Sequence, residues 1–260
     1  SSQGLLAILN DVLDFSKIEA GKLQLDKEQF NLLEIIESAC SLTRLAASER
    51  GNSFNLYLDP QLPKFVLADA VRLRQVLVNL LSNAIKFTKN GQVNFSVCRN
   101  KIEGLRSEQH VVEIVFSVED TGIGIPKEQR QHIFKAFQQG DISTTKKYGG
   151  TGLGLVISQN ILAMMGSEIH LVSQPGIGST FSFTLQLEQV GPELCDFNNA
   201  LASLNCALVT DSDSFRNSIY DLLTAAGASL TQFDSAQTFL DGSSTVNRFE
   251  VLVVSQLSSG

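Results

Sequence analysis

The sequence predicts an α+β fold, a two-layer sandwich in which helices lie on one face of a mixed sheet of about five strands. Three observations support this prediction. Apolar residues recur at helical spacing in several long segments, and they alternate with polar residues in short runs between those segments. A polar stretch then precedes a separate strand–helix–strand–helix–strand series. We therefore expect one bundle helix, a sandwich and a second, smaller unit, in that order.

The helical segments have a repeating apolar face, and some have a clear start or end. Residues 4–22 carry a wide stripe of Leu, Val and Ile that suits a helical bundle, with Gly21 near the end. Asn31 and Asp69 are the expected N-caps of the next two helices. The helices predicted for the sandwich are 31–50, 69–88, 127–136 and 152–165.

The strands of the sandwich are short runs bounded by turn residues. The run 53–58 alternates and then meets Asp59-Pro60, and the segment 175–178 (PGIG) indicates a hairpin turn between the last two strands. The predicted strands are 53–58, 92–99, 111–119, 168–174 and 180–188.

The end of the chain predicts a second unit with a parallel sheet. Its expected strands and helices alternate, and such an order requires crossover connections between parallel strands. They are 206–210, 214–226, 229–233, 235–241 and 249–254. We divide the chain into a bundle helix (1–22), the sandwich (23–190), a polar linker (191–203) and the second unit (204–260).

Composition excludes several classes of protein. The chain has 260 residues and a net charge of −7 without a basic stripe, which argues against nucleic acid as a partner. Its four cysteines form no CxxC pair and indicate a reduced, cytoplasmic setting. No apolar run approaches the roughly 18 residues that a bilayer span needs, although a parent protein could be anchored elsewhere.

Polar residues on one side of the helix 69–88 predict a site for phosphate and metal. Asn79, Asn83 and Lys86 lie at spacings of four and three residues, away from most of the Leu/Val stripe. Two carboxamides and an ammonium suit a hydrated Mg²⁺ and phosphate oxygens. The alternative is an ordinary polar helix face.

A second motif follows the strand 111–119. Asp120 continues the apolar face of Ile114, Phe116 and Val118, and a buried carboxylate there needs a donor such as the exocyclic amine of adenine. Gly122 and Gly124 would let the backbone approach a flat ring. The alternative is a turn with a solvated Asp.

Glycines also surround the start of the helix 152–165. The segment 148–155 (YGGTGLGL) places backbone N–H groups at a helix N-terminus, where an anion is favoured. Its spacing is neither that of a Rossmann motif nor that of a P-loop. The upstream loop adds Lys146 and Lys147, and Gly176–Phe181 forms a tight turn before a strand.

In order and spacing these four elements resemble the nucleotide-binding boxes of the superfamily of gyrase, heat-shock chaperone ATPases, histidine kinases and MutL, and within it those of histidine kinases. The resemblance covers residues 5–188 and includes an F box at 134–138. It implies a Bergerat-type fold that binds ATP and Mg²⁺, with Asn83 on the metal, Asp120 on the adenine amine and Thr180 assisting Asp120. The residues that it implies around the nucleotide are Asn79, Asn83, Lys86, Asp120, Gly122, Gly124, Phe137, Lys146, Lys147, Tyr148, Gly150, Thr151, Gly152, Leu153, Gly154 and Thr180.

The identity of residue 79 favours phosphoryl transfer over hydrolysis. In the ATPase relatives a Glu at this position activates water, and an amide cannot take a proton at neutral pH. Asn79, Asn83 and Lys86 are therefore the expected catalytic set for transfer to an external nucleophile. The alternatives are a hydrolytic ATPase and a nucleotide-dependent scaffold without catalysis.

The resemblance also implies partners. His110, His132 and His170 do not fit the family's acceptor motif, so the accepting histidine is expected on a phosphotransfer helix of the parent kinase, which would be a homodimer. The second unit resembles part of a flavodoxin-like receiver domain, as in hybrid kinases, and a response regulator or receiver is the expected further partner. Ser212 and Ser255 stand where receivers carry acids, which predicts a pseudo-receiver.

Overall fold

The computed structural model describes residues 2–100, 111–130, 132–136, 152–193, 201–202, 204–211, 213–241 and 249–254. The chain forms two compact units, which are described separately. The first comprises Ser1–Leu56 and Pro63–Gly191, and the second comprises Tyr57–Leu62 and Pro192–Gly260.

The first unit contains the helices α1 (Ser2–Glu19), α2 (Leu32–Glu49), α3 (Ala70–Phe87) and α5 (Gly154–Met164). Both predicted N-caps are confirmed. The side chain of Asn31 accepts the N–H of Leu33, and that of Asp69 accepts the N–H of Arg72. Each cap satisfies a backbone donor that has no partner inside its helix, and so fixes where the helix begins.

The sheet of the first unit has seven strands, in the order β1-β3-β7-β5-β4-β2 with β6 beside β7. They are β1 (Glu28–Asn31), β2 (Ser53–Leu58), β3 (Pro63–Ala68), β4 (Gln92–Asn100), β5 (Val111–Asp120), β6 (His170–Gln174) and β7 (Gly178–Glu193). The α+β class is confirmed, but the expected number of strands was too low. The short β1 and β3, which pair with each other, were not predicted, and the first three residues of the expected linker, 191–193, belong to β7.

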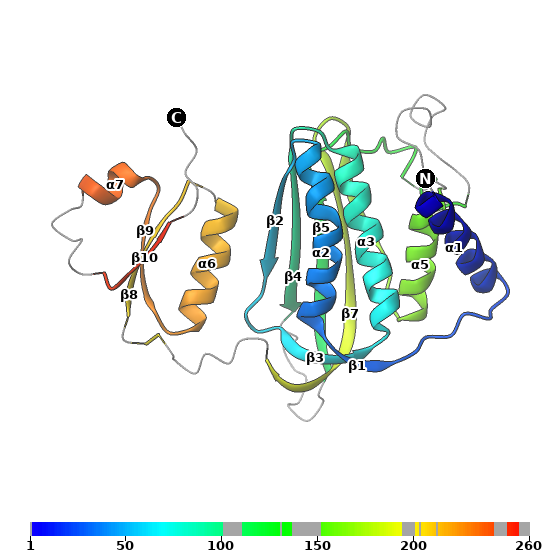
Figure 1. The fold of residues 1–260 in the computed structure, drawn as a ribbon, viewed down its shortest axis with the longest axis horizontal. Helices are drawn as coiled ribbons and strands as arrows, with labels where there is room; N and C mark the ends of the chain where they lie inside the picture. Colours follow the sequence, from blue (N-terminus) through cyan, green and yellow to red (C-terminus); the bar gives the residue numbers. More distant parts are fainter. Residues whose placement is uncertain are drawn as a thin grey trace. The chain divides into compact units, whose positions relative to one another are not determined.

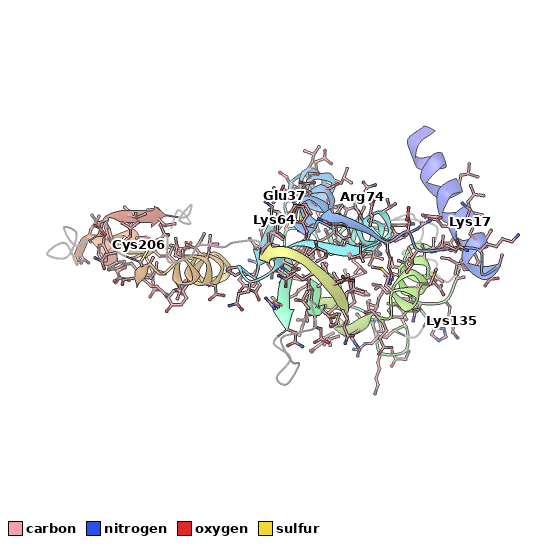
Figure 2. The ribbon with its side chains drawn as sticks, turned by 90° about the horizontal axis from the view of Figure 1, so that it is seen from below. Lys17, Glu37, Lys64, Arg74, Lys135 and Cys206 are labelled. Atoms are coloured by element: carbon pink, nitrogen blue, oxygen red, sulfur yellow. The ribbon has the colours of Figure 1, made fainter. Side chains whose placement is uncertain are left out.

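The core lies between the sheet and the helices α2 and α3, which cover one of its faces (Figure 1). The Leu/Val stripe of α3 is buried, and the helix contacts β4 and β5. The rings of Phe116 and Phe183 stack with 4.8 Å between centroids. In Figure 2 Glu37 of α2 and Arg74 of α3 mark the helical side of the sandwich. This packing fixes the ends of α3, β5 and β7 relative to one another.

The helix α1 contacts α5 and the first turns of α3. Asp14 Oδ2 accepts a hydrogen bond from Arg72 Nη1 at 2.7 Å and another from Gln75 Nε2 at 2.9 Å. Burial alone would raise the pKa of Asp14, but the hydrogen bonds from Arg72 and Gln75 outweigh it and lower the pKa. Asp69, the cap of α3, also accepts the N–H of Asp26 at 3.0 Å. Two carboxylates therefore attach α1 and the segment that follows it to the start of α3.

One predicted helix is wrong where the chain is described. Residues 127–130 and 132–136 form turns. Among the described residues of this segment, most of the N–H groups bond to carbonyls three residues back, as in a 3₁₀ turn, and that of Ile133 bonds four residues back, as in an α-helix.

None of the described helices is long and apolar enough to cross a membrane.

The second unit contains β8 (Asn205–Val209), α6 (Asp213–Ala225), β9 (Ser229–Phe233), α7 (Ala236–Asp241) and β10 (Val251–Val254). Its sheet has the order β10-β8-β9, and both pairs are parallel, which confirms the predicted parallel sheet. The first strand is central, and Cys206–Val209 are buried in it.

Candidate functional site

Asp120 ends the buried face of β5. It is 5% exposed, and Ile114, Phe116 and Val118 on the same face are all buried. The N–H of Gly122 donates to Asp120 Oδ1 at 2.8 Å. Burial raises the pKa of the carboxyl, and the N–H groups of Gly122 and Ser179 and the hydroxyl of Thr88 lower it in part. The site thus holds a desolvated carboxylate that can accept a further donor.

The loop after Asp120 lies directly on neighbouring backbone. A Cβ at Gly122 would stand 2.4 Å from the carbonyl oxygen of Phe87, and a Cβ at Gly124 would stand 2.0 Å from that of Gln174. Gly124 also has a φ of 66°, which glycine adopts without strain. The N–H of Ile123 donates to the carbonyl of Phe87 at 3.3 Å. Only glycine allows the loop to join the end of α3 to the β6–β7 hairpin.

The predicted polar side of α3 is present and faces the start of α5. Asn83 Nδ2 lies 3.3 Å from Asn79 Oδ1, and Asn79 Nδ2 donates to Ser158 Oγ at 2.9 Å. A Cβ at Gly154 would stand 2.3 Å from Asn79 Oδ1, so any larger residue there would displace the Asn79 amide. Leu153 precedes α5 and has an apolar side chain that cannot cap the first N–H groups. The N-terminus of α5 and the two carboxamides together suit an anion with its metal ion.

Lys86 follows on the same helix and is half-buried. Its ammonium lies 5.0 Å from the centroid of the Phe87 ring. Burial lowers the pKa of Lys86, and the charge of Arg50 lowers it further. Arg50 Nη1 donates to the carbonyl of Lys86 at 2.8 Å, which gives a hydrogen-bond donor to one of the last carbonyls of α3.

The strand register corrects the predicted partner of Asp120. Thr180 pairs with Glu119, and Ser179 pairs with Asp120. Directly paired residues point to the same face of a sheet, and successive residues point to opposite faces. Ser179, which is 6% exposed, therefore lies beside the carboxylate, and Thr180 is on the other face.

Of the remaining predicted residues at the start of α5, some are described and others are not. Gly152 and Leu153 lie just before α5, and Gly152 has a φ of 71°. Six predicted residues lie outside the described residues: Phe137, Lys146, Lys147, Tyr148, Gly150 and Thr151.

Besides Ser179, four further residues at the site were not predicted. Thr88 and Ser158 contact the Asp120 and Asn79 groups, while Ser173 and Arg130 hold the loop after Asp120 from the side of β6. Only Ser158 carried a usable signal, since it lies four residues after Gly154 on a predicted helix. The others depend on contacts between segments that are distant in sequence.

Comparisons with known proteins agree with this geometry. Residues 68–189 match the family described as histidine kinase-, DNA gyrase B- and HSP90-like ATPase. These residues form a histidine kinase-type ATP-binding domain. The signal transduction histidine-protein kinase BarA of Escherichia coli K12 is 42% identical over 188 residues, which are 72% of this chain and 20% of BarA.

Two further relatives cover more of the chain. The sensor protein GacS of Pseudomonas syringae pv. syringae is 37% identical over 243 residues, 93% of this chain and 26% of GacS. The crystal structure of full-length ShkA in complex with AMPPNP has a TM-score of 0.72 and 28% identity, and the match covers 92% of this chain and 47% of ShkA. The chain thus spans about a fifth to a quarter of the length of BarA and GacS.

Proposed function

We propose that the first unit transfers the γ-phosphate of ATP to a histidine on a phosphotransfer helix of the parent hybrid kinase. The observation that carries the proposal is the pairing of a buried acceptor, Asp120, with the carboxamides of Asn79 and Asn83 opposite the start of α5. The first group suits the adenine amine, and the others suit the metal–triphosphate. The AMPPNP complex of the similar ShkA supports a nucleotide at such a site.

Each side chain has a distinct part in this proposal. Asp120 binds the adenine amine with Ser179 beside it, and Asn83 offers its amide oxygen to Mg²⁺, which would neutralise phosphate charge. Lys86 and the N–H groups at Gly152, Leu153 and Gly154 orient the phosphates, together with the predicted Phe137, Lys146, Lys147, Tyr148, Gly150 and Thr151.

The alternative of a hydrolytic ATPase is disfavoured by the environment of Asn79. Its Nδ2 is bonded to Ser158 and its Oδ1 to Asn83, so the side chain is a neutral amide engaged at both ends. It supplies no base to activate water. A nucleotide-dependent scaffold remains the second alternative, and it would bind ATP without transfer.

One experiment separates these three functions. The full chain would be incubated with labelled Mg-ATP, alone and with a supplied phosphotransfer hairpin that carries the acceptor histidine. Transfer to the hairpin with little phosphate release supports the kinase, release without transfer indicates an ATPase, and binding alone indicates a scaffold. Asn83→Ala should abolish transfer, whereas Ser82→Ala, one residue away and exposed, should retain it.

We further propose that the second unit is a pseudo-receiver that follows the catalytic domain 23–190. The first three residues of the predicted linker 191–203 belong to β7. Its parallel sheet with the first strand central and Asp211 after that strand supports the receiver-like part. Ser212 and Ser255, which lie outside the described residues, replace expected acids. Phosphorylation of this unit by an acyl-phosphate donor would contradict the proposal. We also propose that the part of the protein in this chain is cytoplasmic. The parent would be a homodimer, with residues 1–22 in its helical bundle and a response regulator or receiver as partner.

A further inference from the structure

Three polar side chains form one row across the strands β5, β7 and β6. The register pairs Asp120 with Ser179 and Ser179 with Ser173. Because directly paired residues share a face, all three point to the same side of the sheet. They are 5%, 6% and 7% exposed, respectively. Ser173 is therefore the far end of a buried row that begins at the carboxylate.

The hydroxyl of Ser173 has three hydrogen-bond contacts. Its Oγ accepts the N–H of Ile125 at 2.7 Å and donates to the carbonyl of Gly178 at 2.9 Å. It also lies 3.0 Å from Ser179 Oγ. A serine hydroxyl has one proton, and the carbonyl of Gly178 cannot donate. With that proton on Gly178, Ser179 has to be the donor in its contact with Ser173.

The direction of this contact determines what Ser179 offers to a ligand. Its only proton points toward Ser173, so the rest of its oxygen presents lone pairs. Asp120 beside it is also an acceptor when ionised. The Asp120 and Ser179 side chains then both present acceptors to the base, which satisfy an amino group and offer no donor to a carbonyl oxygen.

Arg130 keeps Ser173 in place. Its Nε donates to the carbonyl of Ile125 at 3.3 Å, and its Nη2 donates to the carbonyl of Ser173. The guanidinium thus bridges the two backbone segments that the Ser173 hydroxyl also joins. The row is held by main-chain contacts on both sides, and its hydrogen-bond direction is built into the fold.

We propose that Ser173 is a specificity-determining positioning residue, which fixes Ser179 as an acceptor beside Asp120 so that the site prefers a 6-aminopurine to a 6-oxopurine. The inference rests on the proposed ATP site and adds a residue that does not touch the nucleotide. It predicts that the wild-type chain discriminates between ATP and inosine triphosphate, which differ at the 6-position of the base.

Calorimetric titration of the full chain with each nucleotide tests this inference. In Ser173→Ala, the Ser179 proton is free to turn toward a 6-oxo group, so inosine triphosphate should bind about tenfold more tightly while ATP binding changes little. A merely structural defect would weaken both nucleotides. Ser182→Ala, a serine of β7 paired with His170 far from Asp120, is the matched control and should leave both affinities unchanged.

A second variant separates direct from indirect effects. In a Ser179→Ala background there is no proton to turn, so adding Ser173→Ala should give no gain for inosine triphosphate. Ser179→Ala alone, which retains the bonds of Ser173 to Ile125 and Gly178, should also lower the preference for ATP and serves if Ser173→Ala fails to fold.

Three results would overturn the inference: equal wild-type affinity for the two nucleotides, an unchanged preference in Ser173→Ala, or an unchanged preference in Ser179→Ala. A wild-type chain that binds no ATP would instead contradict the proposed site.

Discussion

Exchange of Asp120 for asparagine removes the charge at the base end of the site and keeps the shape of the side chain. Asp120 Oδ1 accepts the N–H of Gly122 at 2.8 Å in a site that is 5% exposed. If the asparagine oxygen keeps that bond, its NH₂ group faces the ligand, where an adenine amine also donates. The variant then loses an acceptor and places two donors opposite each other.

The size of the effect follows from the loss of one buried hydrogen bond to a charged group. Such a bond contributes about 1.5–3 kcal/mol, which corresponds to roughly a 10- to 150-fold weaker Kd for ATP. Stability should change in the opposite direction. Since burial raises the pKa of Asp120, its ionised form opposes folding at neutral pH, and the neutral asparagine should raise the Tm or leave it unchanged.

Calorimetric titration with ATP and a thermal melt measure both effects on the same samples. Glu119→Gln is the matched control, because it makes the same charge change at the neighbouring, exposed position and should leave the Kd within about twofold. The reasoning is refuted if Asp120→Asn binds ATP as tightly as the wild type, or if Glu119→Gln weakens binding equally.

Three further predictions concern pH and packing. Because burial raises the pKa of Asp120, ATP affinity should already fall on acidification at a pH above the ordinary carboxyl pKa of 3.8. The stability contributed by protonated Asp120 is fully present below pH 3.8 and is lost as the pH rises through its raised pKa. Asp120→Asn should show neither pH dependence in titrations and melts. Asn52→Ala should destabilise by about 2–3 kcal/mol in denaturant melts, because the buried amide bonds two carbonyls and an N–H; an unchanged midpoint would contradict this. Gly122→Ala should cost about 1–3 kcal/mol by the same measurement and weaken ATP binding, because its Cβ would press on the carbonyl of Phe87, and normal binding would show that the loop can move.

The fold was predictable wherever the signal is local. Asn31 and Asp69 marked helix starts through their own side chains, and alternation marked β4 and β5. The strand β1 was missed because its four residues alternate too briefly, and it exists through its pairing with β3. The turns near Gln129 have helical composition, and only their hydrogen bonds distinguish them from a helix.

The site residues that belong to a single helix or strand were predictable, but the strand partner of Asp120 was not. The spacing of Asn79 and Asn83 and the period-two position of Asp120 each follow from one element. The partner of Asp120 does not, since Ser179 and Thr180 are adjacent hydroxyls and only the pairing of β5 with β7 decides between them. Ser173 depends on a third strand and could not be inferred from any local pattern.

The attachment of α1 has a mechanical consequence for α3. Asp14 accepts from Arg72 and Gln75, both in the first two turns of the helix that carries Asn79 one turn further along. If α1 rotates about its axis, Asp14 sweeps sideways and has to release these donors or pull the helix with it. A rotation of α1 is therefore passed to Asn79 and Asn83 through α3 itself, with no loop between the two points.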